Sequence, residues 1–233
     1  MRVIFAFEEL SEAHGVQYKI KKYGRGPKST QGALKEHFPL GKSPIITLEE
    51  NGAPSKEIYQ LPQYPGVLTE SRLVLQFMSD TWSKGMWEPQ TEMDKRQDVF
   101  MQEFAINTLA VKCNFALVFE ILPTHLPWGL RHIVGAMASP VVSYWKSDID
   151  PIFKVMEETL SEDRPWFSGV KLGLADINMV WPVEVAWQRK YLNKEKYPKV
   201  AKWFITITSR PAWKRALDIG GKQDLIAFSQ TKA

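Results

Sequence analysis

The pattern of apolar residues in this chain of 233 residues changes near residue 90. The first 80 residues mix short stretches of helical spacing with short stretches of strand-like alternation, whereas the later residues keep helical spacing until the tail. Between them, residues 83–90 contain Gly85 and Pro89, which favours a linker. We therefore expect an α/β domain over residues 1–82 and an all-helical domain over residues 91–233.

The α/β half is predicted to contain short elements. Apolar residues from Val3 to Leu10 recur at helical spacing, which predicts a helix that stops at Gly15. Alternation over residues 16–20 predicts a strand, and two further strands are predicted over residues 44–48 and at residues 67–68. A helical patch is expected around Leu34. A later helix is predicted to keep one apolar face, formed by Val74, Phe77, Met78 and Trp82.

The spacing of apolar residues over residues 91–233 predicts long helices. One is expected over residues 91–121 and a second up to about residue 160, with kinks at Pro140 and Pro151. A compact amphipathic helix is expected after Pro198. The residues of the first long helix that recur every three or four positions are expected to face a core, and they are Phe100, Phe104, Thr108, Val111, Phe115 and Val118.

Composition excludes several classes of protein. The net charge of +4 is too small to imply a nucleic-acid partner. The single cysteine, Cys113, cannot form an internal disulfide, so we expect a cytoplasmic protein in which Cys113 packs as a small apolar residue. No uncharged apolar run approaches the length that spans a bilayer, so an integral membrane protein is not expected. The four histidines lack the spacing of metal ligands, and we expect no metal.

The motif at residues 38–45, Phe-Pro-Leu-Gly-Lys-Ser-Pro-Ile, resembles the glutathione transferases, especially a fungal cytosolic branch. Residues 2–10 resemble the first helix of that family, and residues 69–71 resemble its glutamyl-binding turn. Residues 172–177 are similar to its helical capping motif, and residues 197–203 also fit. The resemblance implies an N-terminal thioredoxin-like domain followed by an all-helical domain, with the first strand of the thioredoxin-like sheet lacking.

In this resemblance the loop before the second strand binds the middle of glutathione. A cis bond between Ser43 and Pro44 would let the backbone of Ile45 pair with the cysteinyl part in a strand-like manner. The alternative is a trans proline that merely opens a strand. With the surrounding motifs in place, we predict the cis form.

The resemblance assigns the two ends of glutathione to other residues. Glu70 and Ser71 would hold the glutamyl end at the start of a helix, where free N–H groups favour a carboxylate. Their alternative role is that of an ordinary helix cap. Lys42 would reach the glycyl carboxylate, although a single lysine is more commonly a solvated surface charge.

The helical domain is expected to provide the acceptor site and a structural cap. Gly173 stands where the family usually has Ser or Thr, and Asp176 can still reach back to the helix start, so half of a capping box is present. The side chains that we expect in an apolar acceptor pocket, with core packing as the equally plausible alternative, are Phe100, Met101, Phe104 and Trp187.

The implied function is that of a glutathione transferase, which conjugates glutathione to a small electrophile or reduces a peroxide with it. The family places its catalytic Ser, Tyr or Cys before the first helix, and the numbered sequence starts inside that helix, so the catalytic residue is unknown. Either the numbering starts at an internal methionine of a longer chain, or the protein is an impaired relative that binds or scaffolds. The resemblance also implies a homodimer, and detoxification and biosynthesis both remain open as roles.

Overall fold

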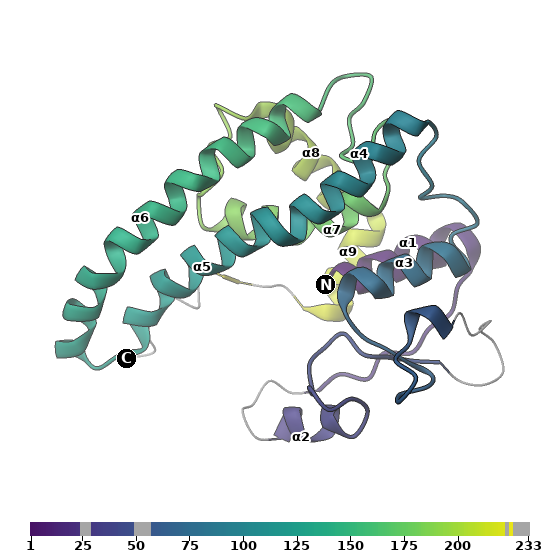
Figure 1. Cartoon of the computed structure of the whole chain (residues 1–233), viewed down its shortest axis with the longest axis horizontal. Helices are drawn as coiled ribbons and strands as arrows, with labels where there is room; N and C mark the ends of the chain where they lie inside the picture. The colour runs from purple at the N-terminus through teal and green to yellow at the C-terminus, as the bar shows by residue number, and fades with distance from the viewer. Residues whose placement is uncertain (24–28, 49–56, 222–223, 226–233) are drawn as a thin grey trace. The chain divides into compact units, whose positions relative to one another are not determined.

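The computed structural model describes residues 1–23, 29–48, 57–221 and 224–225. The chain divides into two compact units, Met1–Trp87 and Glu88–Ala233. Figure 1 labels the main elements of both. The elements of the first unit are α1 (Arg2–His14), α2 (Ser29–Lys35), β1 (Ile46–Thr47), the 3₁₀ turn η1 (Glu57–Tyr59), β2 (Val67–Leu68) and α3 (Ser71–Trp82).

Helices α1 and α3 form the core of the first unit. The ring of Phe7 lies 5.9 Å from that of Trp82, and Phe77 meets Trp82 edge to face at 5.2 Å. Helix α1 ends where the sequence predicted, because Gly15 adopts the left-handed conformation with φ 69° and donates its N–H to Ser11. The predicted face of α3 is confirmed, since its apolar side chains at Val74, Phe77 and Met78 are buried.

The sheet of the first unit is smaller than predicted. Strands β1 and β2 are antiparallel, with Ile46 opposite Leu68 and Thr47 opposite Val67. Strand β1 is shorter than the predicted 44–48, because Pro44 has no N–H to donate to a ladder. The strand predicted over residues 16–20 is wrong. That segment joins no ladder in the described part of the chain, and alternation alone cannot form a strand without a neighbour.

Every named element of the second unit is a helix or a helical turn in the described residues, as predicted, and an isolated β-bridge joins Trp166 to Gly169. Helix α6 runs unbroken through both Pro140 and Pro151. Helix α9 was not predicted, although Pro at its first position is a common helix start. The elements are α4 (Glu92–Glu103), the π-helical turn η2 (Phe104–Leu109), α5 (Ala110–Ile121), the 3₁₀ turn η3 (Leu122–His125), α6 (Trp128–Thr159), α7 (Leu174–Gln188), α8 (Pro198–Ser209) and α9 (Pro211–Gly220).

The core-facing stripe predicted for the first long helix is wrong. Phe100, Phe115 and Val118 are exposed, and the buried stripe lies one or two positions away along the helix. Two apolar stripes run along this helix, and packing selects the one with smaller side chains because it lets neighbouring helices approach closely. Hydrophobicity alone could not choose between them. The buried stripe consists of Met101, Ala105, Leu109, Cys113 and Ala116.

Candidate functional site

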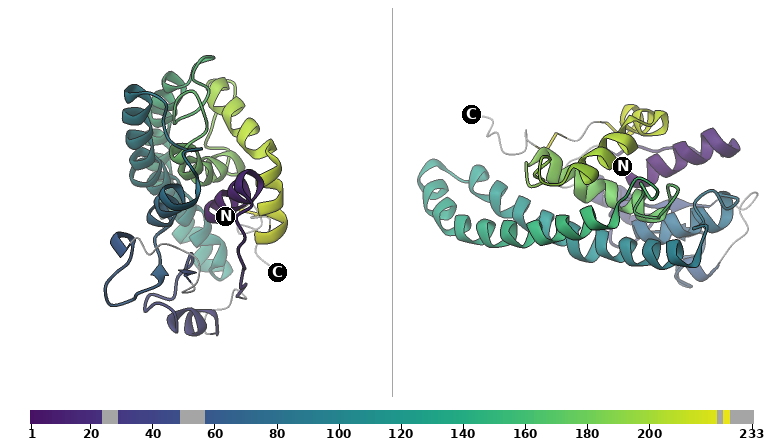
Figure 2. Two further views of the ribbon diagram at one scale, coloured as in Figure 1. Left: turned by 90° about the vertical axis from the view of Figure 1, so that its right-hand side faces the viewer. Right: turned by 90° about the horizontal axis from the view of Figure 1, so that it is seen from above.

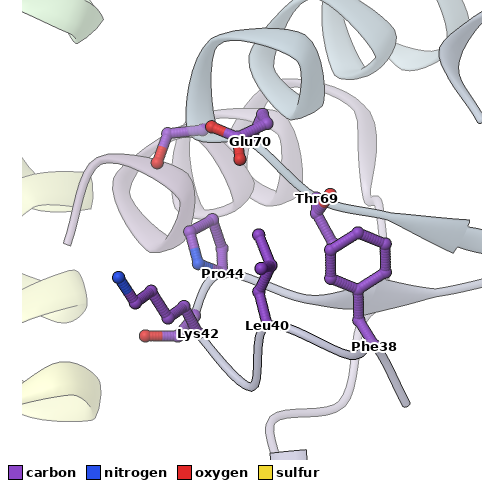
Figure 3. A pocket seen from close by; sticks show the side chains of 8 residues that line it. Phe38, Leu40, Lys42, Pro44, Thr69 and Glu70 are labelled. Carbon is purple, nitrogen blue, oxygen red and sulfur yellow. The ribbon is translucent and has the colours of Figure 1, made fainter. Parts of the chain in front are cut away.

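A pocket of about 160 Å³ lies in the first unit, where two segments distant in the sequence meet (Figure 3). One segment precedes β1, and the other joins β2 to α3. Figure 3 shows Thr69 and Glu70 across the pocket from Lys42 and Pro44. The lining residues are Phe38, Leu40, Lys42, Ser43, Pro44, Thr69, Glu70 and Ser71.

Five of the six residues predicted to bind glutathione line this pocket, and the sixth, Ile45, follows Pro44 directly in the chain. Sequence reasoning missed Phe38, Leu40 and Thr69 as lining residues. The signal was available, because each of them lies inside one of the two motifs on which the resemblance rests.

A tight turn shapes the segment before β1. Gly41 has φ 57° and donates its N–H to the carbonyl of Phe38 at 2.9 Å. The ring of Phe38 meets Tyr64 edge to face at 5.1 Å, which ties the turn to the segment leading into β2. The bond between Ser43 and Pro44 is cis, as the resemblance implied.

The other segment ends in an open helix start. Leu68 of β2 is fully buried, and Glu70 follows it as the N-cap of α3. Glu70 has φ 62°, a conformation that non-glycine residues rarely adopt and that is concentrated at functional sites. Within the described residues its side chain makes no capping hydrogen bond to α3. The first-turn N–H groups of α3 therefore lack a side-chain acceptor from their own N-cap.

This arrangement favours an anionic, peptide-like ligand. A helix start carries partial positive charge and attracts a carboxylate. Lys42 adds a full positive charge on the opposite side, while Ser43, Thr69 and Ser71 supply hydroxyl groups. A ligand with separated carboxylates and amide groups between them matches these features.

The four side chains predicted for an acceptor pocket differ in their surroundings. Phe100 and Phe104 stack with ring centroids 5.8 Å apart. Met101 is 1% exposed and belongs to the core, so its assignment to an open pocket is wrong. Trp187 packs against Phe204 at 4.8 Å, and the ammonium group of Lys194 lies 3.6 Å from its ring centroid.

The start of α7 is closed by buried carboxylates. Gly173 has no side chain to offer, but the carboxylate of Asp176 reaches back and accepts its N–H at 3.1 Å, which confirms the predicted half of the capping box. Asp176 also accepts the N–H groups of Phe167 and Ser168 and the indole N–H of Trp203. Burial raises the pKa of Asp176 to about 6, although these four donors favour its charged form. We interpret this cluster as structural.

Cys113 is also structural. It is fully buried in the core of the second unit. Burial raises the pKa of its thiol to about 12, so the reactive thiolate is not available near neutral pH.

A small α/β unit with a pocket at a cis proline, followed by an all-helical unit, defines a two-domain protein of the glutathione transferase fold. Residues 139–211 match the family model described as glutathione S-transferase, C-terminal domain. The chain is 23% identical to glutathione S-transferase 1 of Saccharomyces cerevisiae over 91% of this chain and 87% of that protein. It is 24% identical to glutathione S-transferase 3 of Schizosaccharomyces pombe over 99% and 88%.

Solved structures agree in fold. A glutathione transferase from Phanerochaete chrysosporium, solved with oxidized glutathione, matches with a TM-score of 0.62 and 21% identity over 95% of this chain and 91% of that one. A glutathione transferase from Burkholderia graminis, solved with two glutathione molecules per subunit, matches with a TM-score of 0.68 and 18% identity over 96% and 86%. The chain has the fold of the glutathione transferases and is similar over most of its length to two fungal glutathione S-transferases.

Proposed function

We propose that this protein is a glutathione transferase that conjugates glutathione to electrophiles or reduces peroxides with it. The observation that carries the proposal is the pocket at the start of α3, where two segments supply five of the six residues implied for glutathione. Relatives solved with bound glutathione support the same ligand. In this proposal residues 1–82 bind glutathione and residues 91–233 bind the acceptor substrate.

The start of α3 would hold the glutamyl end of glutathione. The first-turn N–H groups, which receive no side-chain cap from Glu70, and the helix dipole would stabilise its carboxylate, and the hydroxyl of Ser71 would add a donor. The carboxylate of Glu70 would accept from the glutamyl ammonium group. This division of roles uses both charges of the glutamyl end, which explains why an acidic residue can stand at an anion-binding helix start.

The turn before β1 would hold the rest of the molecule. The backbone of Ile45 would pair with the cysteinyl part as a short strand pairs with a neighbour. Ser43 and Pro44 would set the direction of that backbone, and Lys42 would pair with the glycyl carboxylate. Glutathione would therefore extend from the start of α3 across the pocket to Lys42.

The chemistry begins with loss of the thiol proton of glutathione. In conjugation, the thiolate sulfur forms a bond to an electrophilic carbon, and either a leaving group departs with its electron pair or a double bond accepts the electrons. In peroxide reduction, two glutathione molecules are oxidised to a disulfide while the peroxide O–O bond is cleaved to give water and an alcohol. We assign no catalytic residue within the described part of the chain.

A calorimetric titration with reduced glutathione tests the binding site. Changing Glu70→Gln or Ser71→Ala should each weaken the Kd about fivefold, because each removes one hydrogen-bonding partner of the glutamyl end, worth roughly 1 kcal/mol. Lys42→Met should weaken it by a similar factor. Glu162→Gln, which changes an exposed carboxylate in the second unit, is the matched control and should leave the Kd unchanged. An unchanged Kd in the Glu70 and Ser71 variants would refute the assignment.

Turnover separates the enzyme from the binding or scaffolding alternative. The same protein is mixed with glutathione and a chromogenic electrophile, and the rate is compared with the uncatalysed rate. A glutathione transferase accelerates the reaction, and the Glu70 and Ser71 variants lose rate in parallel with affinity. Tight glutathione binding without acceleration would favour the scaffolding alternative.

The resemblance also supports three finer proposals. Phe100, Phe104 and Trp187 remain candidates for contacts with an apolar acceptor, whereas Met101 is withdrawn because it is buried. The protein is proposed to act in the cytoplasm as a homodimer. Light scattering should then give about twice the chain mass of 26.8 kDa.

A further inference from the structure

Helices α5 and α6 run side by side and are joined by η3 (Figure 1 and the right-hand view of Figure 2). A second pocket, of about 350 Å³, is lined by the end of α5, by η3 and by α6. All of its lining residues belong to the second unit, and none of them lines the pocket at the start of α3. Its volume falls in the range of small-molecule sites, roughly 300–1,000 Å³.

One side of α6 lines this pocket. Gly135, Ser139 and Ser143 follow one another at intervals of four residues, and Lys146 comes three residues later. Residues at these intervals lie on one side of a helix. At Gly135 a Cβ atom would meet the Cβ of Pro123 at 3.8 Å, so a larger side chain at this position would extend into the end of the pocket beside η3.

The pocket also has apolar walls. Phe119 of α5 and Pro123 of η3 line it from one segment, and Ala138 and Val142 line it from α6. Ala138 is buried, whereas Ser143 is exposed, so the pocket extends from the packed surface between the two helices toward solvent. An apolar lining with a few polar groups is typical of sites that bind small organic molecules.

Two lining residues are charged and pair with each other. The ammonium group of Lys146 lies 2.5 Å from Oε1 of Glu120. Oε2 of Glu120 accepts two N–H bonds from Arg189, at 2.6 and 3.0 Å, and the hydroxyl of Tyr191 at 2.7 Å. Glu120 therefore keeps three donors when Lys146 turns away, and the side chain of Lys146 is 45% exposed, which leaves it room to turn. The two cations of this cluster exceed its one anion by one charge.

The other four acids of α5 and α6 lie outside the pocket and have partners. They are Asp148, paired with Lys112; Asp150, paired with Lys196; Glu157, which accepts N–H groups of α8; and Glu158, paired with Lys154. The charges that line the pocket are therefore those of Glu120 and Lys146.

We propose that this pocket binds a small organic acid that has an apolar body and one carboxylate. The body would lie against Phe119, Pro123 and Val142, where its apolar surface leaves water. The carboxylate would pair with Lys146 and accept a hydrogen bond from the hydroxyl of Ser143, on the same side of α6. A cationic ligand would meet the like charge of Lys146, and a neutral ligand would leave the surplus charge of the cluster without a partner.

Glutathione does not match this pocket. It carries two carboxylates and an ammonium group, whereas the pocket offers one surplus positive charge beside apolar walls. The pocket at the start of α3 differs, because it offers two positive groups, the helix start and Lys42. The organic-acid site is therefore a second site, and it does not depend on the proposed function.

Calorimetric titration of the full chain with 4-phenylbutyrate tests the charge requirement. 4-Phenylbutyramide is the matched ligand, because it has the same apolar body without the charge. The acid should bind saturably, and the amide at least about fivefold more weakly, because it lacks the charge-assisted pairing. Lys146→Met should weaken the acid at least about fivefold and leave the amide within about twofold. Lys154→Met is the control on the same helix, since that lysine is 72% exposed and does not line the pocket.

Filling the pocket tests its place. Gly135→Leu should weaken both ligands at least about tenfold, because the new side chain takes up space beside Pro123. Gly129→Leu, which adds the same side chain to the first turn of α6, should leave both affinities within about twofold, since a Cβ atom there meets nothing within 4 Å. Circular dichroism and thermal unfolding of each variant verify that it remains folded.

Four results would overturn the proposal. They are no saturable binding of the acid, equal binding of acid and amide, acid binding that Lys146→Met leaves unchanged, and acid binding that Gly135→Leu leaves unchanged. Weakening of the acid by Lys42→Met in place of Lys146→Met would assign it to the pocket at the start of α3, and would also overturn the proposal.

Discussion

The starts of α3 and α7 differ in what accepts hydrogen bonds from their first N–H groups. Each helix begins with N–H groups that have no partner within the helix. At α7, Asp176 accepts the N–H of Gly173, and Asp98 from α4 accepts that of Ala175 at 2.9 Å. At α3, Glu70 is exposed, has φ 62° and gives no side-chain cap. One start is closed by carboxylates of the chain itself, and the other opens into a pocket.

The difference separates a helix start that the chain closes itself from one that we propose to bind a ligand. Buried carboxylates that already accept several donors have no capacity left for a ligand. A helix start that lacks its cap and is paired with a lysine across a pocket can accept a carboxylate from outside. In this proposal an acid beside a helix start has opposite roles in the two units: Asp176 closes α7, and Glu70 leaves α3 open to a ligand.

The largest expected change in stability comes from removing the carboxylate of Asp176 at the start of α7. Asp176→Ala removes the acceptor of four donors that stay buried, so the free energy of unfolding should fall by roughly 3–5 kcal/mol. Urea unfolding followed by circular dichroism measures it. Asp218→Ala, which removes an exposed carboxylate on α9, should change stability by less than about 0.5 kcal/mol. Equal effects of the two changes would contradict the structural role of Asp176.

A slightly smaller loss of stability is expected from a change at Gly169, in the turn whose backbone N–H groups donate to Asp176. Gly169 has φ 112°, and a Cβ atom there would collide with the carboxylate of Asp94, which pairs with Arg164 at 2.6 Å. Gly169→Ala should lower the free energy of unfolding by roughly 2–4 kcal/mol. Gly129→Ala is the control, because a Cβ atom in that first turn of α6 meets nothing within 4 Å. Thermal unfolding that ranks the two variants equally would argue against this account of the turn.

A third carboxylate, that of Glu184, shows how burial raises a pKa when few hydrogen-bond donors stabilise the charged form. Glu184 in α7 is buried, and in the described part of the chain its Oε2 atom has no hydrogen-bond partner. Burial raises its pKa to about 7, above the usual value of about 4.3 in an unfolded chain. The folded state then binds the proton more tightly, so stability is highest below about pH 4.3 and is lost as pH rises to about 7.

Glu184→Gln removes this dependence. The variant should be more stable than the wild type at pH 8 by roughly 3–4 kcal/mol, and the advantage should disappear at pH 4. Unfolding titrations of both proteins from pH 4 to 8 give the comparison, and other acids cancel because both chains carry them. A pH-independent difference would contradict a protonated Glu184.

The sequence predicted where helices begin and end better than it predicted strands or the buried faces of helices. The end of α1 at Gly15 and the start of α8 at Pro198 follow from local backbone chemistry, so a local pattern suffices. The strand over residues 16–20 needed a partner that no local pattern can supply. The wrong core face of α4 and α5 arose because both stripes are apolar, and the choice depends on the helices that pack there.

In the candidate site, too, local motifs were predicted correctly and features that depend on packing were not. The pocket residues from Lys42 to Pro44 and from Glu70 to Ser71 were found because short motifs mark them. Phe38, Leu40 and Thr69 lie in the same two motifs, but which residues of a motif line the pocket depends on how the two segments meet. Met101 was misassigned because helical spacing does not tell a pocket wall from a core residue.

Backbone amide NMR of the labelled chain during a glutathione titration observes both helix starts in one experiment. We expect saturable chemical-shift changes at the N–H groups of residues 71–73 at the start of α3 and at Ile45. The N–H groups of residues 174–176 at the start of α7 should not move, because Asp98 and Asp176 close that start. Shifts at α7 with none at α3, or no shifts at either, would contradict the division between an open and a closed helix start.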